Sequence, residues 1–111
     1  MKQLKRWLWL AALLVLLSAL PALAHKVNLF AYVEGGTIYT ESYFPDGRPV
    51  VGGKVLVFDS EDHKLLTGDT DQEGRFHFRI PKVDELRLVI KATMGHQNQF
   101  ILQKAEVESG Q

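Results

Sequence analysis

Cysteine is absent from the 111-residue chain, so no disulfide can stabilise the fold and the hydrophobic core must carry the stability alone. A helical hydrophobic period is also missing beyond the first two dozen residues. There is no glycine-rich phosphate loop, and the serine and histidine positions suggest no hydrolase triad. These absences argue against a nucleotide-dependent enzyme, a hydrolase and a helical fold.

One long hydrophobic run is present, and it lies at the N-terminus. A positively charged leader, an apolar stretch and two small residues follow one another there: Lys2, Lys5 and Arg6, then Trp7 to Leu20, then Ala22 and Ala24. This order is typical of a signal peptide, so we expect cleavage after residue 24, export to the periplasm and a mature chain that begins at His25. The alternative is an uncleaved membrane anchor, because residues 7–24 just reach the length of a spanning helix. No cysteine follows the run, which argues against a lipoprotein.

Residues 25–111 suffice for one small domain with a modest core. Three of the thirteen basic residues precede His25, whereas all thirteen acidic residues follow it. The neutral whole chain therefore conceals a mature charge of about minus three. This charge argues against nucleic acid or an anionic membrane surface as a partner.

Short alternating apolar runs, separated by turn residues, predict an all-β domain. Gly35-Gly36 favours a tight hairpin that pairs Phe30 with Glu41 and Tyr32 with Tyr39. About seven strands in under ninety residues are typical of an antiparallel-rich β-sandwich. We expect a frayed tail over residues 106–111. The predicted strands are Lys26 to Val33, Thr37 to Phe44, Lys54 to Asp59, Lys64 to Thr67, Arg75 to Ile80, Leu86 to Thr93 and Phe100 to Val107.

The strongest local signature is the polar turn and strand from Thr70 to Phe78, preceded by Gly53 to Phe58. Together these segments resemble the carboxypeptidase regulatory-like, or transthyretin-like (prealbumin-like), β-sandwich family. The resemblance implies a fold far more than an activity. It also implies that the first and last strands lie side by side and parallel, with their starting ends together.

His25 begins the first predicted strand, and His96 directly precedes the last one. If the two meet, His25 offers its amine and an imidazole nitrogen, and His96 adds a third nitrogen, a set suited to copper(II) or nickel(II) and less well to zinc. Cleavage one residue earlier leaves Ala24-His25, which resembles the amino-terminal metal site in the membrane subunit of energy-coupling-factor nickel transporters. Both cleavage sites lead to a metal hypothesis.

Three segments carry a second resemblance, namely residues 25–32, residues 41–44 and Met94-Gly95-His96. They look like a group of small exported proteins associated with nickel or cobalt uptake transporters. The resemblance implies a non-enzymatic accessory protein that binds metal or supports the membrane subunits, with His25 and His96 as ligands. Glu41 and Met94 are weaker candidates, since a strand glutamate more often pairs with a surface cation and a methionine more often fills the core.

Two other functions stay open. One is a structural or interaction module that uses the sandwich only to dock on another protein. The other is a small histidine-brace copper protein, because a histidine brace consists of an N-terminal histidine and a second histidine. The chain is far shorter than the polysaccharide monooxygenases that use such a brace, which argues against the enzymatic version.

Overall fold

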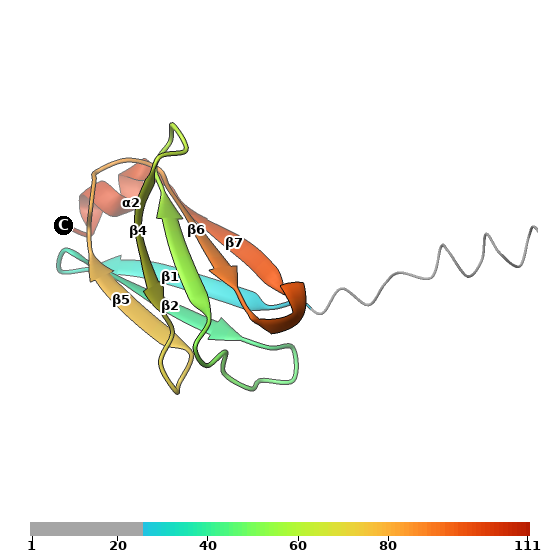
Figure 1. Cartoon of the computed structure of the whole chain (residues 1–111). Coiled ribbons are helices and arrows are strands. Elements are labelled where there is room, and N and C mark those ends of the chain that lie inside the picture. Colours follow the sequence, from blue (N-terminus) through green and yellow to red (C-terminus); the bar gives the residue numbers. More distant parts are fainter. Residues whose placement is uncertain (1–25) are drawn as a thin grey trace, which may run out of the picture.

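A computed structural model describes residues 26–111, which form a β-sandwich of two antiparallel sheets (Figure 1). One sheet has the strand order β1-β2-β5, and the other has the order β4-β3-β6-β7. The prediction of an all-β sandwich is therefore confirmed. The elements are β1 (Asn28–Glu34), β2 (Thr37–Tyr43), β3 (Lys54–Phe58), β4 (Lys64–Asp69), β5 (Arg75–Arg79), β6 (Leu86–Lys91), the 3-10 turn η1 (Thr93–Gly95), β7 (Gln97–Leu102) and α2 (Lys104–Ser109).

The Gly35-Gly36 hairpin has the predicted register. Both glycines have positive φ, 59° and 78°, which a tight hairpin turn requires and which most other residues adopt only at a cost. Phe30 pairs with Glu41, and Tyr32 pairs with Tyr39, as the sequence predicts. The register matters because a slip of one residue would exchange the buried and exposed faces of both strands.

The C-terminal segment differs from the prediction. The last strand, predicted over residues 100–107, begins instead at Gln97 and ends at Leu102, and residues 104–109 form the helix α2. The tail is not frayed, because Val107 is fully buried and the carbonyl oxygen of Gly110 accepts a hydrogen bond from the backbone N–H of Gly36 at 2.8 Å. Six helical residues suffice here because packing against the sandwich, rather than intrinsic propensity, holds the helix.

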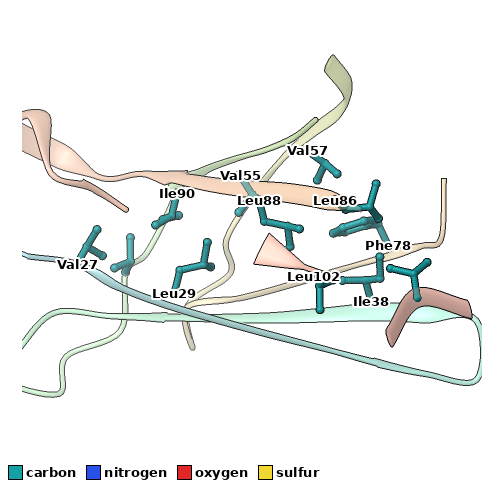
Figure 2. Packing of buried hydrophobic residues seen from close by; sticks show 12 residues of the cluster. Val27, Leu29, Ile38, Val55, Val57, Phe78, Leu86, Leu88, Ile90 and Leu102 are labelled. Carbon is teal, nitrogen blue, oxygen red and sulfur yellow. The ribbon is translucent and has the colours of Figure 1, made fainter. Parts of the chain in front are cut away.

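The hydrophobic core lies between the two sheets (Figure 2). Alternate residues of each strand point inward, so the core draws mainly aliphatic side chains from both layers. Branched and compact side chains pack well in this narrow space. The core residues are Val27, Leu29, Ile38, Val50, Val55, Val57, Phe78, Leu86, Leu88, Ile90, Leu102 and Val107.

Strands β1 and β7 lie side by side, although they belong to different sheets (Figure 1). The side-chain amide Nδ2 of Asn98 donates a hydrogen bond to the carbonyl oxygen of Val27 at 2.8 Å, which joins the starting ends of the two strands. The far end of β1 meets the C-terminal segment through the bond between Gly36 and Gly110. The two strands therefore run parallel, as the transthyretin-like resemblance implies.

The predicted signal peptide and His25 lie outside the described residues. Over residues 26–111, no helix has the length and apolar character needed to cross a membrane.

Candidate functional site

A tight turn between β6 and β7 positions His96. Met94 has φ 61° and ψ 31°, and Gly95 has φ 77°, so two consecutive residues are in the left-handed region. The backbone N–H of His96 donates to the carbonyl oxygen of Thr93 at 3.3 Å, and Ala92 N–H donates to the carbonyl oxygen of His96 at 2.7 Å. These features define a hairpin turn of type I′. The turn fixes His96 at the first position after the bend, directly before β7.

The half-buried His96 side chain packs against the loop that follows β2. Its ring lies edge-on to the ring of Phe44, with 6.1 Å between ring centroids and 76° between ring planes. The Arg48 guanidinium carbon lies 5.3 Å from the centroid of the same Phe44 ring. Small-molecule sites have volumes of about 300 to 1,000 Å³. The groove here measures about 550 Å³ and is lined by Phe44, Pro45, Asp46, Arg48, Thr93, Met94 and His96.

The groove contains one cation and one carboxylate that neutralise each other. Arg48 Nε lies 2.6 Å from Asp46 Oδ2, and the backbone N–H of Arg48 donates to Asp46 Oδ1 at 3.0 Å. The backbone hydrogen bond and the guanidinium together hold the pKa of Asp46 below its usual range. Asp46 is thus ionised at neutral pH and already engaged. The same groove is also lined by the His96 imidazole and the Met94 thioether, which are of the ligand types that a borderline or soft metal prefers.

Met94 is 92% exposed, at the rim of the groove. An L-residue with φ near 60° costs about 1–2 kcal/mol relative to ordinary backbone, and glycine or asparagine normally occupies this position. The exposure shows that Met94 does not fill a gap in the core, which was the competing interpretation of this residue. The structure thus brings Met94 and His96 into one groove.

Glu41 lies elsewhere. It is on the outer face of the β1-β2-β5 sheet, where its carboxylate accepts a hydrogen bond from the Tyr43 hydroxyl at 3.3 Å and lies 3.5 Å from Arg75 Nε. A second groove, of about 410 Å³, includes Glu41, and none of its lining residues lines the His96 groove. Pairing with a surface cation, the ordinary role of a strand glutamate, is what the structure shows.

The start of β1 lies next to the His96 turn. Val27 is fully buried, and its carbonyl oxygen accepts the hydrogen bond from Asn98, two residues after His96. His25 precedes Val27 by two residues and lies outside the described residues. Within residues 26–111, no group of three or more histidine or acidic side chains is arranged to hold a metal ion.

Sequence reasoning did not single out Asp59, which is the most buried carboxylate among the described residues. Its side chain is 2% exposed, and its oxygens accept hydrogen bonds from the backbone N–H groups of Glu61 and His63, both at 2.9 Å, and from Lys82 Nζ at 3.0 Å. Burial opposes ionisation of Asp59, but these hydrogen bonds outweigh it and hold its pKa well below the usual range. His63 Nδ1 lies 3.2 Å from the same carboxylate.

Asp59 fastens the 59–63 turn to the segment before β6, so its role is structural. The sequence signal was the acidic residue at the end of a strand followed by a polar run, which is typical of a side chain that caps its own turn. Its partner Lys82 is far along the chain, and no local pattern links the two.

No family model matches the chain, and no solved structure matches it. An uncharacterized protein from Haemophilus influenzae is 30% identical over 108 residues, which cover 95% of this chain and 67% of that protein. The chain belongs to the family of that protein. The similarity extends over nearly the whole chain, but the relative is uncharacterized, so the similarity assigns no activity. The transthyretin-like resemblance stays a prediction.

Proposed function

We propose that the protein is an exported, non-enzymatic accessory component of a nickel or cobalt uptake system, and that it binds the metal through His25 and His96. The observation that carries this proposal is the hydrogen bond from Asn98 Nδ2 to the carbonyl oxygen of Val27, which joins the start of the first strand to the strand that follows His96. The transport role rests on the resemblance to exported proteins associated with nickel or cobalt transporters. The hydrogen bond between Asn98 and Val27 supports the pairing of His25 with His96.

Covalent reach supports the pairing. Val27 is held beside β7, two residues from His25 along the chain, and two residues of extended chain span at most about 7 Å. This short reach supports the proposed pairing of His25 with His96. The protonation cost is small, because an α-amine with a pKa near 7.8 loses its proton at pH 7 for roughly 1 kcal/mol. Metal–nitrogen bonds readily offset that cost.

The donor set fits a borderline transition metal. Two imidazoles and an amine suit nickel(II), cobalt(II) or copper(II), and the Met94 thioether in the same groove adds a soft ligand that favours copper(I). Copper is therefore the competing metal in this proposal. When bound, the ion would act as cargo, and the residues of this chain would serve to capture and present it.

Calorimetric titration of the processed protein tests this function, after mass spectrometry has established that His25 is its first residue. We expect nickel(II) or cobalt(II) binding that His96→Ala weakens by tenfold or more, because one of the three nitrogens is lost. His77→Ala is the matched control, since His77 is an exposed histidine on the outer face of β5. Equal nickel affinity in His96→Ala and in the unaltered protein would contradict the proposed site.

A further inference from the structure

The outer face of the β1-β2-β5 sheet carries an unusual concentration of aromatic and charged side chains. Alternation along each strand places these residues on the solvent side, opposite the core. Phe30 and Tyr32 are 57% and 51% exposed. Tyr32 stacks on Tyr39 with 5.2 Å between ring centroids, and Tyr39 lies 5.9 Å from the ring of His77. The face thus presents a row of three rings across its strands.

On this face, residues paired across the three strands form rows, and the outward residues of each strand form a column. One row contains Tyr32, Tyr39 and His77, and the neighbouring row contains Phe30, Glu41 and Arg75. The row nearest the Gly35-Gly36 turn contains Glu34, Thr37 and Arg79.

The two outer columns of the face differ in character. The β1 column offers two aromatic rings and the carboxylate of Glu34, whereas the β5 column offers Arg75, His77 and Arg79. Glu34 and Arg79 stand in the same row, on either side of β2, and no ion pair joins them within the described part of the chain. One edge of the face is thus complementary in charge to the other edge.

We propose that this face binds a second copy of the same chain, in a dimer whose twofold axis runs along β2. Rotation about that axis places β1 of one copy over β5 of the other, row by row. Glu34 then faces Arg79 of the second copy, Tyr32 faces His77, and Phe30 faces Arg75. Symmetry makes every contact occur twice, so the interface gains two ion pairs, two ring contacts and two cation–π contacts.

Charge also selects this arrangement over the other symmetric one. An axis across the strands, along the row of Tyr32, Tyr39 and His77, would place β1 over β1 and β5 over β5 in reversed row order. Glu34 would then lie over Phe30 of the other copy, without a cation, and Arg79 would lie over Arg75 of the other copy. Like charges placed opposite each other disfavour association. The axis along β2 also keeps the strands of the two sheets nearly aligned, as in aligned sheet packing.

The outward residues of β2, which form the central column, are compatible with a twofold axis along this strand. Tyr39 faces its own copy there, which lets two aromatic rings pack together. Glu41 also approaches its own copy, but each Glu41 carboxylate already lies 3.5 Å from Arg75 Nε of its own chain. Arg75 Nη1 also lies 3.0 Å from Glu73 Oε2, in the turn before β5.

The size of the face sets the expected affinity. The three strands lie about 4.8 Å apart and rise about 3.4 Å per residue. With seven residues in β1 and in β2 and five in β5, they cover at most roughly 15 by 24 Å. This flat area of roughly 360 Å² is less than half of the about 800 Å² that a standard interface buries on each partner, so the face has the size of a weak, transient contact. We therefore expect a reversible dimer with a dissociation constant in the micromolar range, rather than an obligate one.

Sedimentation velocity on the purified protein, as the cell produces it from the full coding sequence, tests the dimer. Solutions from about 1 µM to about 1 mM span the expected range. A metal chelator in every sample keeps the result independent of the proposed histidine site. We expect a concentration-dependent shift from monomer to dimer.

Charge reversals make the test specific. Glu34→Arg and Arg79→Glu should each weaken self-association by about tenfold or more, because two like-charge contacts replace two ion pairs. An equimolar mixture of the two variants should regain the dimer, since Arg at position 34 of one chain then faces Glu at position 79 of the other. The double variant Glu34→Arg/Arg79→Glu should also dimerise by itself.

Lys64→Glu on the edge strand β4 is the control, since Lys64 is exposed and belongs to the other sheet. It should leave the dimer unchanged. A protein that stays monomeric up to about 1 mM would overturn the proposal and leave the face to a different partner. A mixture of the two single variants that remains monomeric, with both variants folded by circular dichroism, would overturn it as well.

Discussion

At the scale of single residues, Met94 combines an uncommon conformation with nearly complete exposure. Its φ of 61° belongs to a position of a type I′ turn that asparagine and glycine favour. Residues in such conformations concentrate at functional sites, where the cost of the conformation is tolerated. Met94 lies in one groove with His96, so a role in the proposed metal site would explain why this unfavourable backbone conformation is retained.

Met94→Asn should therefore stabilise the fold while it weakens any soft-metal binding. Asn-Gly is the preferred dipeptide for this turn, so we expect a gain of about 0.5–1 kcal/mol in the free energy of unfolding. Urea denaturation measures this gain, and the exposed Gln99→Ala on β7 is the neutral control. A loss of stability in Met94→Asn would show that the methionine side chain contributes to packing after all.

Gly68 in β4 illustrates the opposite constraint, a lack of space. A Cβ atom at this position would overlap the ring of Phe76, which itself packs against Phe78 with 5.6 Å between ring centroids. Gly68→Ala should lower the free energy of unfolding by about 1–3 kcal/mol, because the aromatic ring must move to admit a methyl group. The adjacent exposed Thr67→Ala is the control in the same denaturation series. Equal stability of the two variants would mean that Phe76 relaxes freely.

At the scale of elements, α2 closes one end of the sandwich. The one buried side chain of this helix is Val107. Gly110, which directly follows the helix, accepts a backbone hydrogen bond from Gly36 in the Gly35-Gly36 turn. The helix therefore fixes both the C-terminus and the far end of β1.

Val107→Ala should cost about 1.5–3 kcal/mol, because it removes buried methyl groups from a fully enclosed site. Lys104→Ala is the matched control, since its ion pair with Glu108 spans 3.9 Å on the exposed side of the same helix and is worth little. Hydrogen exchange should show faster exchange of the Gly36 amide in Val107→Ala only. Similar exchange in both variants would argue that α2 does not hold the turn.

At the scale of the whole molecule, the ionised Asp59 ties the stability of the domain to pH. Burial opposes its ionisation, yet hydrogen bonds from His63, Lys82 and Glu61 keep the pKa of Asp59 well below the usual value near 3.9. A depressed folded-state pKa contributes stability that is present above the unfolded pKa and is lost as pH falls toward the folded value. The domain should therefore lose stability progressively below about pH 4.

Thermal unfolding between about pH 7 and pH 2 measures this effect. Asp59→Asn should be less stable than the unaltered protein at pH 7, because Lys82 loses its buried partner, and its midpoint should depend less steeply on pH below 4. Asp69→Asn is the control, because that carboxylate is exposed and pairs with the exposed Lys54. The same acid dependence in Asp59→Asn and in the unaltered protein would exclude Asp59 as its source.

Strands, turns and register were predictable because their signals are local. Alternation of apolar residues sets which side chains face inward, and Gly35-Gly36 fixes the pairing of Phe30 with Glu41 over a few residues of chain. The end of the chain was predicted wrongly for the same reason. Lys104, Ala105, Glu106 and Glu108 favour a helix, but a six-residue helix is not stable by itself. This helix depends on a pocket for Val107 that distant strands provide.

Local patterns in the chain were thus enough to predict the all-β fold, the hairpin register and the place of His96 just before a strand. The contact of β1 with β7, the groove that Met94 shares with His96, the separate groove of Glu41 and the burial of Asp59 against Lys82 depend on the folded domain. The alternation of apolar and polar residues shows which side chains of a single strand face inward, but it does not show which strands become neighbours. The choice of neighbours depends on how two sheets close a common core, through contacts between residues far apart in the chain.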